Sequence, residues 1–198
     1  MRPELTGVIL AGGEGRRMGG RDKALVPLAG RPLVAHVLER LRGQVDSVRI
    51  NANGDPERYR RFGVPVDPDR WPGRPGPLAG MATALARAPT ERVLVVPCDA
   101  PLLPADTAAR LVAALEGAGA DAAVARAGGR LQPVLALLQR CLLDDLEAVL
   151  GAGERRVDRF LARHAVVEAD LEDEADALVN VNTPEDLEAV AQRLASIR

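Results

Sequence analysis

The chain has very few aromatic residues: one Trp, one Tyr and two Phe, which amount to 2% of its 198 residues. Proteins that bind single-stranded nucleic acid usually need such rings for stacking, together with a basic surface. The formal net charge is −2 at pH 7, so the overall field of the molecule does not attract polyanions. A nucleic-acid-binding protein is therefore not expected, and any bound anion needs a local cluster of positive charge.

Long apolar runs are also lacking. None approaches the roughly 20 residues of a membrane-spanning helix, and the short apolar segment before Gly12 does not fit a signal peptide. The two cysteines, Cys98 and Cys141, lie far apart and form no C-x-x-C pair, a pattern typical of proteins with free thiols. We therefore expect a cytoplasmic protein with no membrane partner.

Histidines are scarce as well. His36 and His164 are the only two, and neither lies near a group of Cys or Asp residues with the spacing of metal ligands. The sequence therefore favours neither a histidine-based metal site nor hydrolysis by a histidine general base. The 47% of hydrophobic residues suffices for a folded core, and the length and the absence of a clear linker predict a single domain, 1–198.

Short apolar runs alternate along the chain with segments of helical period. Strands are expected at 5–10, 45–52, 64–67, 92–98, 120–125 and 132–139. Helices are expected at 31–42, 56–62, 78–88, 104–116, 142–150, 155–163 and 183–193, and the proline-rich stretch 67–80 reads as a loop. This alternation predicts a three-layer α/β/α sandwich with a mainly parallel sheet, of the Rossmann-like class.

Ligands of such folds collect at the carboxyl ends of the strands. That rule places Leu10–Lys23, Asn51–Asn53 and Cys98–Pro101 side by side in space, although they are far apart in the sequence. We therefore expect the functional site to be built from these three segments.

The segment Leu10–Lys23 follows the first expected strand and contains five glycines and four cationic residues. Backbone amides of glycines can approach an oxyanion closely, and the cations can neutralise a polyphosphate. The segment is not a dinucleotide fingerprint, because Met18 stands at the third glycine position. It is not a Walker A loop, because Lys23 follows Asp22 and precedes Ala24. A third type of phosphate-binding loop fits better than a basic surface loop without function.

Asp99 follows the most apolar expected strand of the chain. A carboxylate at the tip of a central parallel strand is well placed to hold Mg²⁺ against phosphates. The alternative is that Asp99 only caps the turn after the strand. Its neighbour Cys98 is expected to be a small core residue rather than a reactive thiol.

Eight short segments, spread in order over nearly the whole chain, form a pattern. They are Leu10-Ala11-Gly12-Gly13, Arg17-Met18-Gly19-Gly20, Asp22-Lys23, Gly30-Arg31-Pro32-Leu33, Asn51-Ala52-Asn53, Gly76-Pro77-Leu78-Ala79-Gly80, Pro97-Cys98-Asp99 and Asn180-Val181-Asn182-Thr183-Pro184. The opening loop alone would indicate only the wider nucleotidyltransferase superfamily. Together, the segments resemble the molybdenum cofactor guanylyltransferases.

The resemblance implies an enzyme with a Rossmann-like nucleotidyltransferase fold that transfers GMP from GTP to the terminal phosphate of molybdenum-molybdopterin, using Mg²⁺ and releasing pyrophosphate. It also leaves room for other proteins of the cofactor pathway as partners. Catalytic roles are implied for Lys23, Arg17 and Asp99, with Asp99 also holding the metal ion. The implied GTP-binding residues are Leu10, Ala11, Gly12, Gly13, Lys23, Asn51, Asp69, Gly80 and Asp99.

Asn180 and Asn182 match the segment that would lie on the pterin side, apart from the GTP side and Lys23. Asn182 has a simpler alternative role in capping the helix that begins near Pro184, although Thr183 is the better cap. Two other functions stay open. One is a sister nucleotidyltransferase, such as a cytidylyltransferase, although these typically begin L-A-A-G. The other is a non-catalytic GTP-binding module, against which the presence of both Lys23 and Asp99 argues.

Overall fold

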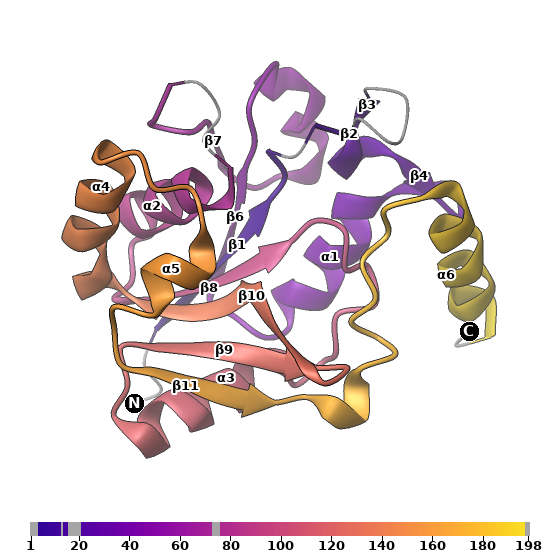
Figure 1. The fold of residues 1–198 in the computed structure, drawn as a ribbon. Helices are drawn as coiled ribbons and strands as arrows, with labels where there is room; N and C mark the ends of the chain where they lie inside the picture. The colour runs from indigo at the N-terminus through magenta and orange to yellow at the C-terminus, as the bar shows by residue number, and fades with distance from the viewer. Residues whose placement is uncertain (1–3, 13, 16–20, 73–75, 197–198) are drawn as a thin grey trace.

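A computed structural model of the chain describes residues 4–12, 14–15, 21–72 and 76–196. Its centre is a seven-stranded sheet in the order β11-β9-β10-β8-β1-β6-β7 (Figure 1). The strands are β1 (Leu5–Leu10), β6 (Ser47–Asn51), β7 (Val66–Asp67), β8 (Arg92–Pro97), β9 (Ala122–Ala127), β10 (Arg130–Gln139) and β11 (Val166–Asp170). Only β10 runs antiparallel to its neighbours in this sheet, so the expectation of a mainly parallel sheet is confirmed.

Helices alternate with these strands along the chain. They are α1 (Leu33–Arg42), α2 (Pro77–Arg87), α3 (Thr107–Ala118), α4 (Leu143–Gly151), α5 (Val157–Leu161) and α6 (Pro184–Ser196). Short 3₁₀ turns are η2 (Lys23–Leu25), η3 (Pro56–Arg58), η4 (Arg60–Phe62), η5 (Arg140–Leu142) and η6 (Glu172–Glu174). Two small hairpins pair β2 (Glu14–Gly15) with β3 (Arg21–Asp22), and β4 (Pro27–Leu28) with β5 (Arg31–Pro32).

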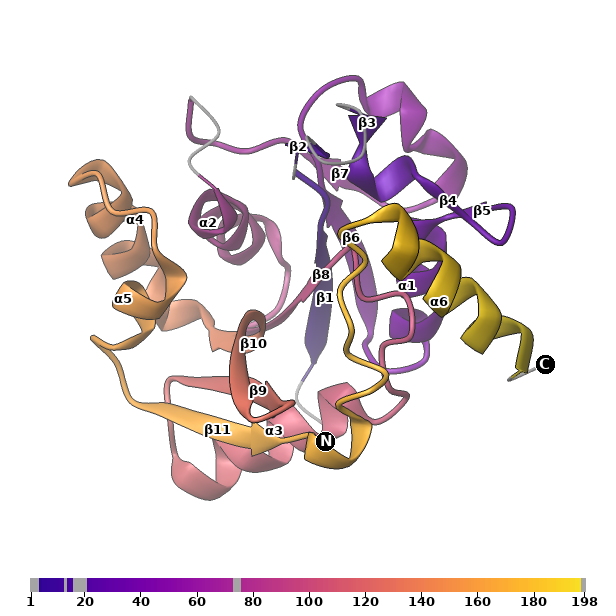
Figure 2. The ribbon, with the colours of Figure 1, turned by 45° about the vertical axis from the view of Figure 1, so that its right-hand side comes forward.

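The helices cover both faces of the sheet, with α1 and α3 on one face and α2, α4 and α5 on the other (Figures 1 and 2). Successive side chains of a strand point to opposite faces. Leu5 and Ile9 of β1 accordingly pack in the core beneath α1, while Val8 packs beneath α2. Because both faces are buried, β1 and β8 are almost continuously apolar. The predicted three-layer α/β/α sandwich is confirmed.

The main differences from the expected elements lie at their ends. Helix α2 begins at Pro77, inside the stretch 67–80 that reads as a loop, because proline fits the first helical turn and Gly76 supplies the preceding turn with a φ of 85°. The expected helix 56–62 is instead two 3₁₀ turns that meet at Tyr59. Helix α3 begins only at Thr107, whose hydroxyl donates to the carbonyl of Pro104 at 2.9 Å.

After β11, the chain returns across the carboxyl edge of the sheet before it enters α6 (Figure 2). The backbone amide of Val181 donates to the carbonyl of Asp99 at 2.9 Å, which joins this returning segment to the tip of β8. Val181 and Val190 pack with Val26, Leu28 and Leu102 in a separate small apolar cluster. Within the ranges described above, none of the helices has the length and apolar character needed to cross a bilayer.

Candidate active site

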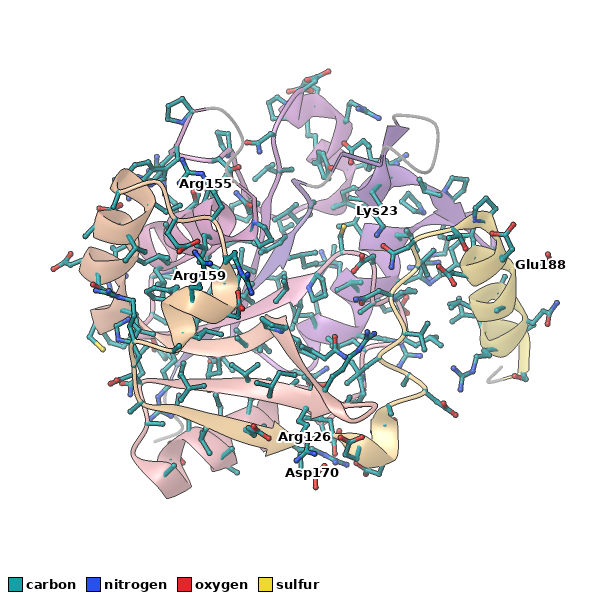
Figure 3. All side chains as sticks on the ribbon, in the orientation of Figure 1. Lys23, Arg126, Arg155, Arg159, Asp170 and Glu188 are labelled. Carbon is teal, nitrogen blue, oxygen red and sulfur yellow. The ribbon has the colours of Figure 1, made fainter. Side chains whose placement is uncertain are left out.

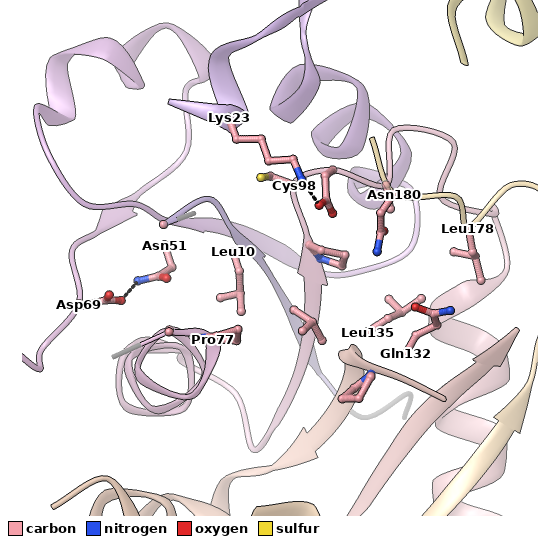
Figure 4. A pocket seen from close by; sticks show the side chains of 18 residues that line it. Leu10, Lys23, Asn51, Asp69, Pro77, Cys98, Gln132, Leu135, Leu178 and Asn180 are labelled. Carbon is pink, nitrogen blue, oxygen red and sulfur yellow. Dashed lines mark hydrogen bonds and ion pairs between the residues drawn. The ribbon is translucent and has the colours of Figure 1, made fainter. Parts of the chain in front are cut away.

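A cavity of about 430 Å³ lies at the carboxyl edge of the central strands (Figure 4). Leu10 of β1, Asn51 of β6 and Asp99 after β8 all line it, and Lys23 reaches into it from η2. The three segments that sequence reasoning placed side by side therefore meet here. The remaining lining residues are Gly12, Asp69, Gly76, Pro77, Gly80, Pro97, Cys98, Ala100, Gln132, Pro133, Val134, Leu135, Leu178 and Asn180.

Lys23 and Asp99 form an ion pair on one wall of this cavity. The Nζ atom of Lys23 lies 2.5 Å from Oδ2 of Asp99, and the two side chains are 14% and 15% exposed. The same Nζ donates to Oδ1 of Asn182 at 2.7 Å. Lys23 is the single lysine of the chain, which has 25 arginines. Figure 3 shows this lysine where the N-terminal segments approach the returning C-terminal segment.

The contact with Asn182 bears on one expectation. The resemblance puts Asn182 on a pterin side separate from Lys23, yet the two side chains are hydrogen-bonded. The simpler capping role falls to Thr183, whose Oγ1 accepts from the backbone amide of Asp186 at 3.2 Å. Asp186 in turn accepts from the amides of Asn182 and Thr183. The side chain of Asn182 therefore takes no part in the helix cap and contacts Lys23, which lines the cavity.

The other carboxylate oxygen of Asp99, Oδ1, is buried and has no hydrogen-bond partner among the described residues. A buried carboxylate oxygen without a donor is costly, so the site is suited to a cation. In the part of the chain that the structure describes, no group of three or more acidic, cysteine or histidine residues could hold a metal ion. A single carboxylate with substrate phosphates as further ligands is the arrangement that Mg²⁺ favours.

Asn51, Asn53 and Asp69 form a polar network on the opposite wall. The Nδ2 atoms of Asn51 and Asn53 donate to Oδ1 and Oδ2 of Asp69 at 2.9 and 2.7 Å. Oδ1 of Asn53 accepts from the backbone amide of Asp69 at 2.9 Å. The network fixes both the loop after β7 and the orientation of the Asn51 amide, and leaves hydrogen-bond acceptors facing the cavity (Figure 4). Such acceptors suit the N–H groups of a base or the hydroxyls of a ribose.

Gly80 in the first turn of α2 makes room for this arrangement. A Cβ atom at Gly80 would lie 2.6 Å from Oδ1 of Asn51 and 2.9 Å from Cδ2 of Leu10. The absence of a side chain there is thus required by the orientation of Asn51. Gly12 is less crowded, since its Cβ would meet only Nδ2 of Asn53, at 3.3 Å.

Part of the backbone of the opening loop is engaged in the sheet. The amide of Ala11 donates to the carbonyl of Asn51 at 2.8 Å, and the carbonyl of Leu10 accepts from the amide of Cys98 at 3.1 Å. These two groups serve the fold, so a ligand would use other backbone groups of Leu10–Gly12. Gly13 and Arg17, for which the resemblance also implies roles, lie outside the described residues.

Cys98 is buried among apolar residues, as expected for a small core side chain. Burial and the neighbouring Asp99 carboxylate raise the pKa of its thiol far above the usual value. A thiol of this kind stays protonated at neutral pH and is a poor nucleophile. His36 is likewise structural: it is buried in α1, and its Nε2 lies 2.9 Å from the carbonyl oxygen of Leu28.

One part of the cavity carries only a weak signal in the sequence. Residues 132–135 of β10 line it, next to Leu178 and Asn180 of the returning segment. The register of β10 against β9 shifts between Gln132 and Ala136, and Pro133 lies at this irregularity. A proline within an expected strand is the signal that could have indicated a bulge, whereas Leu178 carries no recognisable signal.

Comparison with known proteins agrees with this geometry. Residues 7–168 match the model of the MobA-like NTP transferase domain. The molybdenum cofactor guanylyltransferase of Shewanella pealeana is 47% identical over 196 residues, which cover 99% of this chain and 98% of that protein. The corresponding protein of Shewanella loihica is 46% identical over 195 residues, covering 98% and 100% of the two chains.

The solved structures add a match to the whole fold. The crystal structure of molybdopterin-guanine dinucleotide biosynthesis protein A from Archaeoglobus fulgidus superimposes with a TM-score of 0.81 at 26% identity. The superposition covers 98% of this chain and 100% of that one. The matches in sequence and fold span nearly all of the chain, and the chain belongs to the MobA-like NTP transferases, in the family of molybdenum cofactor guanylyltransferases.

Proposed function

We propose that this protein transfers GMP from GTP to the terminal phosphate of molybdenum-molybdopterin and releases pyrophosphate. The relatives reported above carry the name of this activity. The observation in the molecule that carries the proposal is that Lys23, at one wall of the cavity, contacts both Asp99 and Asn182. A cation, a carboxylate with an unpartnered buried oxygen and a neutral acceptor together suit a reaction between two phosphates.

The nucleotide would lie between this wall and the network of Asn51 and Asp69. Oδ1 of Asn51 lies over Gly80, where it can accept from the N–H groups on the edge of a guanine base or from a ribose hydroxyl. Leu10, Ala11 and Gly12 would border the nucleotide at the end of β1, and the sequence resemblance adds Gly13 to this set. A base without the N–H groups of guanine would leave buried acceptors of the site unpaired. Such a site selects guanine for this reason.

A divalent cation, Mg²⁺ in our proposal, would bind to Asp99 together with phosphate oxygens of the nucleotide. The unpartnered Oδ1 of Asp99 is the observation that supports this placement. When bound, the cation lowers the repulsion between the two anionic reactants. The Nζ of Lys23 contacts Oδ2 of the same carboxylate. The ammonium group and the cation would therefore each contact one oxygen of Asp99.

The chain needs no side-chain nucleophile for this reaction. The terminal phosphate oxygen of molybdopterin forms a bond to the α-phosphorus of GTP, and the bond from that phosphorus to the bridging oxygen of pyrophosphate breaks. The attacking oxygen is already ionised, so a general base is not required. The ammonium of Lys23 neutralises charge that builds up on the leaving pyrophosphate, and we propose the same role for Arg17 from the sequence resemblance.

The second substrate would occupy the other half of the cavity. Asn180 and the residues Gln132–Leu135 and Leu178 line that half and combine apolar surface with two side-chain amides. A flat heterocycle with polar edges fits such a lining. In this arrangement Asn182 lies at the boundary between the two substrates, because it contacts Lys23. We propose further that residues 1–198 act as one domain in the cytoplasm and that other proteins of the cofactor pathway are partners.

Pyrophosphate release measured with each of the four NTPs, with and without molybdopterin, tests the proposal. We expect release with GTP only, and only in the presence of molybdopterin. Turnover with CTP equal to that with GTP would identify a sister cytidylyltransferase instead. Binding of GTP with no turnover, in the presence of Mg²⁺ and molybdopterin, would identify a binding module.

A further inference from the structure

Tyr59, the single tyrosine of the chain, is 1% exposed and lies where η3 and η4 meet. Its ring belongs to the same buried cluster as Ala24, Ala52 and Cys98, and Cys98 lines the cavity. The ring of Phe62 packs against it at a centroid distance of 6.0 Å. A buried tyrosine normally finds a partner for its hydroxyl, and the identity of that partner is informative here.

The hydroxyl of Tyr59 lies 2.8 Å from both Oδ1 and Oδ2 of Asp22 and donates to this carboxylate. Arg58 adds a weaker contact, with its Nη1 3.6 Å from Oδ2 and its own side chain 51% exposed. Burial and the charge of Asp22 raise the pKa of the Tyr59 hydroxyl well above its usual value, so it remains a donor. The carboxylate of Asp22 is thus held on the side of Tyr59.

Asp22 directly precedes Lys23, and its side chain makes no capping hydrogen bond to η2. The contact with Tyr59 therefore fixes the position of Asp22, the residue that precedes Lys23 in the chain. From there, the Nζ of Lys23 reaches Asp99 and Asn182 at 2.5 and 2.7 Å. If the Tyr59 hydroxyl were missing, the Asp22 carboxylate, whose side chain is 14% exposed, would lose this donor, and the residue before Lys23 would no longer be fixed.

We infer that Tyr59 is a positioning residue for the transfer reaction: through Asp22, its hydroxyl sets the direction in which Lys23 enters the site. One part of this inference rests on the proposed function, namely that Lys23 acts on the triphosphate. The contact needs an acceptor at position 22 rather than a charge. Asparagine should therefore preserve the function of Asp22, and alanine should not. Tyr59→Phe keeps the ring in the core and removes only the donor.

The experiment uses the fact that Lys23 is the single lysine. An amine-reactive ester therefore labels only Lys23 and the α-amine, and mass spectrometry of the two peptides gives both rates, the α-amine serving as the internal standard. We expect Tyr59→Phe and Asp22→Ala each to label Lys23 about tenfold faster than the wild type. Asp22→Asn should stay within about threefold of the wild type.

Turnover provides the second measurement. Tyr59→Phe and Asp22→Ala should each lower kcat by about tenfold and change the KM for GTP by less than about threefold. Because both substitutions break one contact, the double variant should be no worse than either single variant. If the two residues acted independently, their effects would instead multiply in the double variant.

Thr90→Val is the matched control. The hydroxyl of Thr90 is also buried and donates to Oγ1 of Thr6 at 2.8 Å, toward the amino end of β1 and away from the site. This variant should lower the Tm without changing the labelling of Lys23 or kcat. Loss of stability alone therefore cannot produce the expected result.

Unchanged labelling and turnover in folded Tyr59→Phe would overturn the inference, and so would multiplying effects in the double variant. If circular dichroism shows that Tyr59→Phe does not fold, the contrast between Asp22→Ala and Asp22→Asn decides, since equal behaviour of the two overturns the inference. Failure of the proposed function looks different: the wild type would release no pyrophosphate, while the labelling experiment on the free protein would still give its result.

Discussion

Lys23 pairs with one carboxylate oxygen of Asp99, at 2.5 Å from Nζ to Oδ2, while the other oxygen of Asp99 has no partner among the described residues. In the free protein the lysine is therefore the cation that Asp99 holds. A divalent ion approaching Asp99 meets the positive charge of the ammonium group until phosphates arrive to share that group. Metal binding at this site should accordingly depend on the nucleotide.

The first prediction follows from this pair. Without GTP, Lys23→Met should bind Mn²⁺ about tenfold more tightly than the wild type, a change of about 1.4 kcal/mol, because the repelling charge is gone. Its turnover should fall by about 10²–10³-fold, because the leaving pyrophosphate loses its counter-charge. Titration of Mn²⁺ followed by electron paramagnetic resonance measures the affinity. An Mn²⁺ affinity equal to that of the wild type would contradict the prediction.

Asp99 gives the second prediction. Asp99→Asn keeps the shape of the side chain but loses the charge that attracts the cation, so turnover should fall by about 10²-fold or more. Asp99→Ala should be at least as poor, and circular dichroism should show both variants folded. Asp144→Asn, which removes an exposed carboxylate of α4, should keep full activity. If Asp99→Ala proved unfolded, a structural role of Asp99 in the turn after β8 would be the better interpretation.

Gly80 tests the wall of the cavity that we assign to the nucleotide. In Gly80→Ala the new methyl group would lie 2.6 Å from Oδ1 of Asn51, so the amide must turn away. GTP affinity measured by calorimetry should fall by about tenfold or more, since a lost hydrogen bond costs about 1–3 kcal/mol. The control is Gly117→Ala in α3, where nothing lies within 4 Å of the added Cβ. It should gain about 0.5–1 kcal/mol of stability and bind GTP normally.

Asn182 separates two arrangements of the substrates. If its contact with Lys23 matters, Asn182→Ala should lower kcat by about tenfold even at saturating molybdopterin, since a hydrogen bond to a charged group contributes about 1.5–3 kcal/mol. Asn180→Ala should instead weaken only the binding of molybdopterin. Helix α6 should survive in both variants, because Thr183 supplies its cap. A kcat of Asn182→Ala equal to that of the wild type would restore the simple division into a GTP side and a pterin side.

His36 predicts how stability depends on pH. Burial lowers the pKa of this histidine below its ordinary value of 6.5, with the charge of Arg31 acting in the same direction and the contact with Leu28 opposing it. As the pH falls below 6.5, the unfolded chain therefore binds a proton at His36 before the folded chain does. This contribution to stability is full above pH 6.5 and is lost as the pH falls through the folded pKa. Urea unfolding of His36→Gln should show a smaller loss of stability between about pH 7.5 and 5.5 than the wild type; an equal loss would contradict the assignment.

The fold was largely predictable because its central strands are buried on both faces. Val93–Val96 is apolar throughout, which is typical of a central parallel strand, and the glycine and proline breaks mark the ends of most elements. The ends of elements were less predictable. The start of α2 at Pro77 and the break at Tyr59 depend on how each segment packs against the sheet, and that packing leaves little trace in local sequence.

The site was predictable to the extent that topology brings strand ends together. The rule that ligands gather at the carboxyl ends of parallel strands united Leu10, Asn51 and Asp99 without any structure. It could not reveal the contacts of Lys23 with Asn182, or of Tyr59 with Asp22, because each joins segments whose approach is set by the packing of whole elements. Such contacts between polar side chains become visible only in three dimensions.

The hydrogen bond from the amide of Val181 to the carbonyl of Asp99 has a consequence for shortened forms of the chain. All seven strands of the sheet lie within residues 5–170, so a chain that ends after Asp170 still contains every strand of the sandwich. Asn182, however, lies 159 positions after Lys23, so such a chain lacks this partner of the lysine and the returning segment that carries it. Truncation after β11 would therefore keep all the strands and remove the contact of Lys23 with Asn182.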